Sequence, residues 1–170
     1  AIAGLIAATT GNAVGVASMY PGTKVLPVRV AGKCGAVLSD VLDGLRWAAG
    51  LPVAGVPANP HPARVISLSY GGSGACGVTY QSAVNEITAA GALLVVAAGN
   101  ADGPLTRPAD CDGVVAVTGA RADGAKASYA SLGSQVALVA PGGSALSGTL
   151  DAGLVSTYDS GRRGPQSSAY

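Results

Sequence analysis

The chain has 170 residues, a length that suits one domain with a sizeable core. Ten Lys and Arg against nine Asp and Glu leave a net charge of +1, which argues against a nucleic-acid partner. Gly, Pro or charged residues interrupt each apolar run before it reaches the length of a membrane span, so we expect no membrane partner. The chain begins at Ala1 without Met and in mid-pattern, so we expect it to be cut from a longer protein.

Three elements are predicted before the centre of the chain. Residues 1–9 are apolar all round and rich in Ala, which predicts a buried helix. Residues 24–30 have the apolar, β-branched composition of a strand. Residues 38–50 follow helical spacing, with Ser39 or Asp40 near the N-cap.

The central stretch, residues 65–100, predicts a strand, a glycine-rich turn, a helix and a second strand. The helix is expected over residues 79–90, with Thr79 as its N-cap and Gly91 as its terminator. Residues 93–96 are all apolar, which is typical of a strand covered on both faces. In such a βαβ unit, function gathers beyond the carboxyl ends of the strands, here at residues 69–72 and 97–100.

Two further strands are expected over residues 114–119 and 135–140. Helices that alternate with apolar strands indicate an α/β domain with a parallel sheet. A proline-rich stretch at residues 51–63 carries the single histidine, His61, and is expected to be an irregular surface excursion.

The three cysteines, Cys34, Cys76 and Cys111, form no zinc-binding pattern. Cys76 and Cys111 both follow central strands in loop-like sequence, so they could form a disulfide, which leaves Cys34 with a partner outside the chain. The alternative is three free thiols in a cytosolic protein.

One interpretation of the glycine-rich turn is a dinucleotide-binding site of an oxidoreductase. Residues 72–77 match the pattern GxGxxG after a strand and before a helix, and Asp102 could contact a ribose. However, the predicted helix begins after the last glycine, and Asp102 lies beyond the usual spacing of about 20 residues.

The other interpretation comes from a resemblance that covers nearly the whole chain. In order, six segments resemble those of the subtilisin-like serine proteases, particularly secreted bacterial members with a GKCG segment at residues 32–35. The six segments are residues 3–8, 28–30, 66–72, 95–100, 127–133 and 140–142. The resemblance implies a three-layer αβα fold with a mostly parallel sheet, and it makes residues 1–170 an incomplete peptidase catalytic domain without its N- and C-terminal parts.

The resemblance implies a secreted serine endopeptidase that hydrolyses peptide bonds in proteins by acyl transfer. It places the catalytic aspartate and histidine before Ala1 and the nucleophilic serine shortly after residues 168–170, so the chain alone should be inactive. His61 does not match the catalytic histidine and is expected to be a surface residue. A pseudoprotease that binds peptide without hydrolysing it is a further alternative.

Asn100 matches the asparagine of the family that donates a hydrogen bond to the oxyanion. Without the resemblance, an asparagine after a glycine at a strand end is more typical of a left-handed turn. The resemblance also implies substrate-binding residues in the S1 pocket, along an edge segment that pairs with the substrate backbone, and, for one leucine, in the S4 subsite. These residues are Ser69, Tyr70, Gly71, Gly72, Ala97, Ala98 and Gly99 for S1, Cys34, Gly35 and Ala36 for the edge, and Leu38 for S4.

The remaining expectations also follow from the resemblance. It pairs Cys76 with Cys111 and gives Cys34 a partner upstream of the chain. It implies a monomer that requires no cofactor and acts on protein or peptide. Many family members bind a structural calcium ion at the loop of residues 9–16, which here has no carboxylate and only Asn12 as a side-chain amide, so we assign no metal ligands. Pro108 falls where the family often has a cis proline, although trans is the default.

Overall fold

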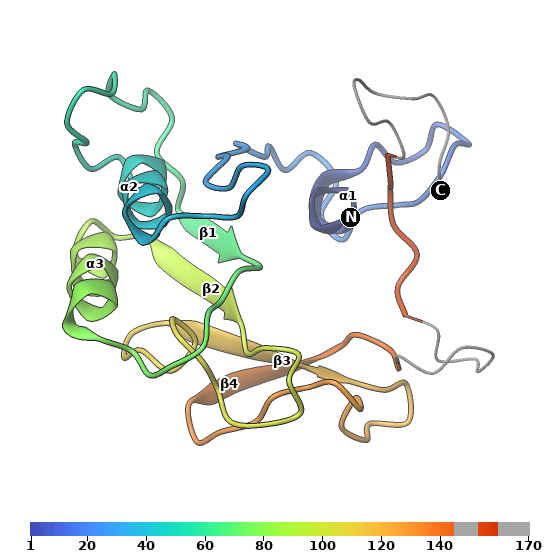
Figure 1. Cartoon of the computed structure of the whole chain (residues 1–170). Coiled ribbons are helices and arrows are strands. Elements are labelled where there is room, and N and C mark those ends of the chain that lie inside the picture. The colour runs from blue at the N-terminus through green and yellow to red at the C-terminus, as the bar shows by residue number, and fades with distance from the viewer. Residues whose placement is uncertain (145–152, 160–170) are drawn as a thin grey trace. The chain divides into compact units, whose positions relative to one another are not determined.

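The computed structural model describes residues 1–144 and 153–159, so residues 168–170 lie outside the described part. The chain forms two compact units, one of Ala1–Pro27 with Leu154–Tyr170 and one of Val28–Gly153 (Figure 1). The second unit contains all the candidate site residues. Within the described residues, no helix is both long and apolar enough to span a bilayer.

The second unit is built on a four-stranded parallel sheet with the order β1-β2-β3-β4. The strands are β1 (Val65–Leu68), β2 (Leu93–Ala97), β3 (Val115–Ala120) and β4 (Val136–Pro141). The register sets Leu68 opposite Val96, and a bulge shifts the pairing of β3 with β4 between Ala116 and Val117. The structure therefore confirms the predicted α/β fold with a parallel sheet.

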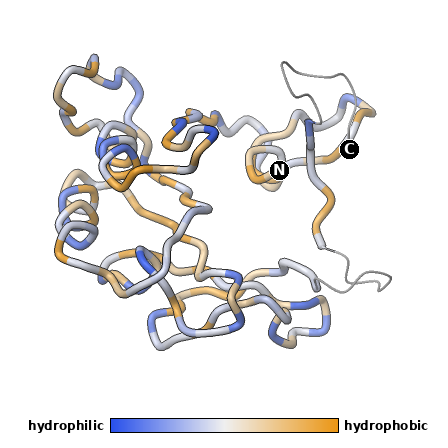
Figure 2. The backbone as a smooth tube through the Cα atoms, in the orientation of Figure 1, coloured by the Kyte–Doolittle hydropathy of each residue, from blue (hydrophilic) through white to orange (hydrophobic). Residues whose placement is uncertain are grey.

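Two helices cover one face of this sheet. Helix α2 (Leu38–Ala48) and helix α3 (Val78–Ala89) contact each other, and α3 contacts β2. Apolar side chains at helical spacing meet alternate side chains of the strands in one core, because only one stripe of each helix and one face of each strand is buried. Figure 2 shows this apolar character along β1 and β2. The principal core residues are Val41, Leu42, Leu45, Ala83, Val84, Ile87, Ile66, Leu68, Leu94, Val96 and Ala116.

No helix among the described residues of this unit covers the opposite face of the sheet. Val65 is 59% exposed and Leu93 is 46% exposed, so the prediction that residues 93–96 are covered on both faces is wrong for the described residues. The described residues of this unit supply one helical layer of the expected three-layer arrangement.

Two elements differ from their predictions because burial and pairing depend on neighbours. Helix α1 (Ile2–Ala7) buries only Gly4, which contacts Thr157, so the prediction of a buried helix is wrong. Residues 24–30 form no strand, since they pair with no strand in the described part of the chain.

The helix starts also differ from prediction. The N-cap of α3 is Gly77 instead of Thr79, and that of α2 is Val37 instead of Ser39 or Asp40. Asp40 lies inside the first turn of α2, where a carboxylate interacts favourably with the helix dipole.

Candidate functional site

The two strand ends singled out by the sequence lie side by side. β1 and β2 are parallel neighbours with Leu68 opposite Val96, so residues 69–72 and 97–100 leave the sheet at the same edge. Most of these residues are exposed, but the side chain of Ala98 is buried in the core, so only its main chain borders this edge.

A third segment, residues 104–108, lies against both strand ends. The N–H of Gly72 donates to the carbonyl of Arg107 (3.0 Å), and the N–H of Arg107 donates to the carbonyl of Gly74 (3.2 Å). A Cβ on Gly71 or on Gly99 would each lie 3.7 Å from the hydroxyl of Thr106, so this hydroxyl stands between the two glycines. The absence of a side chain at both glycines therefore lets neighbouring segments approach the two strand ends closely.

Sequence analysis did not identify Thr106 or Arg107 as site residues. The only signal was their position just before Pro108. The Arg107–Pro108 peptide bond is cis, the isomer that is frequent at this place in the family, and not the default trans. The guanidinium of Arg107 supplies positive charge here. This charge acts on Tyr80, a buried residue of α3. Burial raises the pKa of the Tyr80 hydroxyl and the nearby Tyr70 raises it further, whereas the positive charge of Arg107 lowers it.

Asn100 is exposed at the end of β2, on a turn whose left-handed positions are taken by other residues. Gly99 has a φ of +115° and Asp102 has a φ of +48°, whereas Asn100 has no positive φ. The alternative that Asn100 merely occupies a left-handed position is therefore wrong. Its side chain makes no hydrogen bond to the described residues, so its amide N–H groups remain available as donors.

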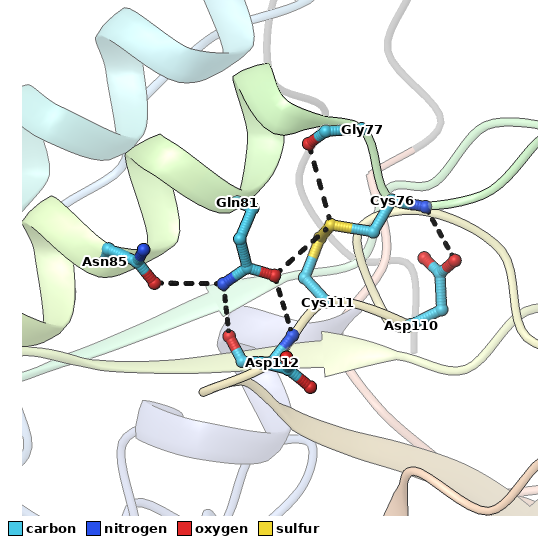
Figure 3. Close-up of a disulfide and its surroundings, with 7 residues drawn as sticks. All are labelled: Cys76, Gly77, Gln81, Asn85, Asp110, Cys111 and Asp112. Carbon is cyan, nitrogen blue, oxygen red and sulfur yellow. Dashed lines mark hydrogen bonds between the residues drawn. A yellow bond between two sulfur atoms is a disulfide. The ribbon is translucent and has the colours of Figure 1, made fainter.

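A disulfide between Cys76 and Cys111 joins the loop after β1 to the loop after β2. Figure 3 shows two side chains that support it. The Asp110 carboxylate accepts from the N–H of Cys76 (2.7 Å), and Gln81, near the start of α3, bonds both main-chain groups of Asp112 at 2.9 Å. The cysteine pair is the one that the resemblance implied, whereas sequence analysis missed Gln81 and Asp110.

These contacts also bear on the dinucleotide interpretation. The N–H of Cys76 within the glycine-rich turn is already occupied by the carboxylate of Asp110, and the N–H of Gly72 by a carbonyl. A pyrophosphate needs free N–H groups at a helix N-terminus, and a carboxylate there repels it. Asp102, the candidate ribose ligand, forms an ion pair with Lys126. The arrangement disfavours a dinucleotide.

The edge segment forms a tight turn that precedes α2. Gly32 and Gly35 exchange two main-chain hydrogen bonds (2.9 and 3.2 Å), and Cys34 is exposed with a free thiol. The N–H of Gly35 is thus occupied, while Cys34 and Ala36 make no backbone hydrogen bond to the described residues. Leu38 is 39% exposed at the start of α2, apart from the buried face of that helix.

The loop of residues 9–17, in the first unit, surrounds an open hollow of about 300 Å³. Asn12 Oδ1 accepts a hydrogen bond from the N–H of Val14 (3.1 Å), and the loop has no carboxylate. Within residues 1–144 and 153–159, no three His, Cys, Asp or Glu side chains form a metal-binding group. Calcium takes about six to eight oxygen ligands, and this loop offers main-chain carbonyls and the Asn12 side chain but no carboxylate, so we assign no calcium ligands to it.

His61 lies exposed on the proline-rich excursion, where its main-chain N–H donates to Asn59 Oδ1 (2.8 Å). The amide of Asn59 in turn donates to the carbonyl of Trp47 near the end of α2 (3.0 Å). The excursion is therefore tied to the helix through Asn59, and His61 is a surface residue, as predicted.

The comparisons of this chain with known proteins agree on one family. Residues 1–170 match the model of the subtilase family. The chain is 46% identical to an extracellular protease of Xanthomonas campestris, over 99% of this chain and 28% of that protein. It is 43% identical to an extracellular basic protease of Dichelobacter nodosus, over 99% of this chain and 27% of that protein. A solved protease of Pseudoalteromonas arctica is 45% identical, with a TM-score of 0.89 over 97% of this chain and 49% of that one.

Proposed function

This chain belongs to the subtilase family, and on that premise we propose that the complete protein is a secreted serine endopeptidase. The chain spans little more than a quarter of the curated relatives it matches, at 28% and 27% of their lengths. The observation that carries the proposal is the side-chain amide of Asn100, which has no hydrogen-bond partner among the described residues and lies just beyond the edge where β1 and β2 end.

The proposed reaction is acyl transfer to a serine. A serine that lies outside residues 1–170 attacks the peptide carbonyl carbon, and a histidine accepts its proton. The negative charge that develops on the carbonyl oxygen accepts a hydrogen bond from the side-chain amide of Asn100. When the C–N bond breaks, the histidine returns the proton to the leaving amine, and water then hydrolyses the acyl-enzyme.

The remaining site residues of this chain hold the substrate. An extended peptide approaches along Cys34–Gly35–Ala36, where Cys34 and Ala36 keep their main-chain groups available. The P1 side chain enters the space between residues 69–72 and 97–99, which Thr106 and Arg107 close. Leu38, half-exposed at the start of α2, contributes an apolar wall to S4.

We place the complete protein outside the cell as a monomer without a required cofactor. Its relatives from Xanthomonas campestris and Dichelobacter nodosus are named extracellular proteases, and the Cys76–Cys111 disulfide suits an oxidising compartment. A structural calcium ion at the loop of residues 9–17 stays compatible with this proposal, and Asn12 and main-chain carbonyls are the oxygen donors that the loop itself offers.

The decisive variant is Asn100→Ala in the complete protein, assayed with a chromogenic peptide amide. We expect kcat to fall by about 10²–10³-fold with little change in KM, a magnitude taken over from subtilisin, itself a subtilase. The interaction forms mainly in the transition state, which is why binding changes less. Asn85→Ala, which removes an asparagine from α3, is the matched control.

An unchanged kcat in Asn100→Ala would contradict the oxyanion assignment. If the unaltered complete protein binds peptide but does not hydrolyse it, the protein is a pseudoprotease and the proposed activity is wrong.

A further inference from the structure

Ser131 is a completely buried serine in the loop between β3 and β4, 0% exposed. Each of its polar groups has a partner. Its N–H donates to the carbonyl of Gly99 (3.0 Å), its Oγ accepts from the N–H of Ala101 (3.4 Å), and its carbonyl accepts from the hydroxyl of Thr118 (2.7 Å). These three hydrogen bonds tie the main chain and the Oγ of this buried residue to neighbouring segments.

Two of these partners are the residues directly before and after Asn100. Ser131 therefore fixes the main chain on both sides of Asn100, while the Asn100 side chain stays without a hydrogen bond to the described residues. The same loop continues this support, since Asp102 N–H donates to the carbonyl of Tyr129 (3.0 Å) and Leu132 N–H donates to that of Gly103 (2.9 Å).

Ser131 is connected to the sheet through Thr118, which is buried in β3. The rigid strand thus positions Ser131, and Ser131 positions the turn that carries Asn100. A serine suits this place in size and chemistry. An alanine would leave the Ala101 N–H without its acceptor. The fit to Gly99 is close, because a Cβ on Gly99 would lie only 3.0 Å from the Ser131 Oγ.

We propose that Ser131 is a positioning residue for catalysis, which holds the Asn100 turn so that its amide is directed at the developing oxyanion. This inference rests on the proposed function, because it gives Ser131 a role only through Asn100. A donor must be fixed in advance to stabilise the transition state, so loosening the turn should lower kcat more than it raises KM.

The test compares Ser131→Ala with two controls in the complete protein, measuring kcat, KM and Tm. We expect Ser131→Ala to lower kcat about tenfold and to change KM by less than about twofold. Ser128→Ala makes the same chemical change at an exposed position of the same loop and should leave kcat unchanged. Val84→Ala, in the buried face of α3, should lower Tm without lowering kcat, which controls for lost stability.

A double-mutant cycle with Asn100→Ala separates positioning from a general structural role. In the Asn100→Ala background, adding Ser131→Ala should change kcat by less than about twofold, because the residue through which Ser131 acts is already gone. An unchanged kcat in Ser131→Ala alone, or the same tenfold loss in both backgrounds, overturns the inference.

The proposed function fails in a different way, through an unaffected kcat in Asn100→Ala or a complete protein without hydrolytic activity. Should Ser131→Ala not fold, Ser131→Cys replaces it throughout the cycle with the same expected pattern, because a thiol has a similar shape but is only a weak acceptor.

Discussion

Two loops of this protein contain similar residue types but differ in the hydrogen bonds that support them. The turn of residues 99–103 and the loop of residues 9–17 each contain one asparagine and at least one glycine with positive φ. The first is hydrogen-bonded at Gly99, Ala101, Asp102 and Gly103 to a second segment, residues 129–132. The second has one hydrogen bond among its own residues, from the N–H of Val14 to Asn12 Oδ1.

The difference determines which of the two asparagine side chains keeps its hydrogen-bonding groups available among the described residues. In the turn of residues 99–103, main-chain groups make the supporting bonds and the Asn100 amide remains free. In the loop of residues 9–17, the Asn12 oxygen is used to hold the loop itself. A side chain is available to a substrate when neighbouring segments supply the support that it would otherwise provide.

The largest expected effect comes from removing the Cys76–Cys111 disulfide, whose closed segment contains the turn of residues 99–103. Cys76 and Cys111 are separated by 35 residues, so the double change Cys76→Ala/Cys111→Ala should lower the free energy of unfolding by about 3–4 kcal/mol. The cause is the greater freedom of the unfolded chain without the cross-link. Urea unfolding of the complete protein measures it, with the exposed Ser73→Ala as control. A loss below about 1 kcal/mol would contradict the expectation.

A direct comparison of the two loops comes from one glycine in each. Gly99→Ala should destabilise the protein by about 3 kcal/mol, because its φ of +115° disfavours a side chain and its Cβ would lie 3.0 Å from Ser131 Oγ. Gly11→Ala, with a φ of +75° and nothing within 4 Å of its Cβ, should cost about 1 kcal/mol from the backbone alone. Equal losses in urea unfolding would show that Ser131 does not confine Gly99.

The smallest effect is expected from an ion pair between exposed side chains. Arg46 Nε lies 2.6 Å from Glu86 Oε2 and joins α2 to α3. The hydrogen bond from Arg46 lowers the pKa of Glu86 below its ordinary 4.5, so the stabilisation is present above pH 4.5 and is lost as pH falls through the lowered pKa.

Glu86→Gln should therefore lower Tm slightly at pH 7, and its Tm should converge with that of the unaltered protein in acid. Salt should also reduce the difference at pH 7, since exposed charges are screened. A difference that persists in acid would contradict the role of the carboxylate charge.

Local patterns predicted the parts of the fold that depend on local chemistry. The apolar runs at residues 65–69 and 93–96 predicted the parallel pair β1 and β2, and the family resemblance supplied the disulfide partners. Residues 1–9 and 24–30 were mispredicted because apolar composition does not specify what a segment packs against or pairs with.

The supporting residues of the candidate site escaped sequence reasoning for the same reason. The bond from the N–H of Ala101 to Ser131 Oγ spans 30 residues, so nothing near Asn100 in the sequence marks Ser131. Thr106 lies near two glycines, Gly71 after β1 and Gly99 after β2. These glycines come together only because of the register of the two strands. Such roles arise from tertiary contacts, which a motif does not encode.

The disulfide also changes the consequence of a proteolytic cleavage of the chain. Cys76 and Cys111 lie at the two ends of a segment that contains all of α3 and β2. A single cleavage within that segment leaves both halves covalently attached to the same molecule, so the nicked chain separates only after reduction. In the proposed endopeptidase, a first autolytic cut between Cys76 and Cys111 would therefore leave the segment that carries Asn100 attached to the rest of the chain.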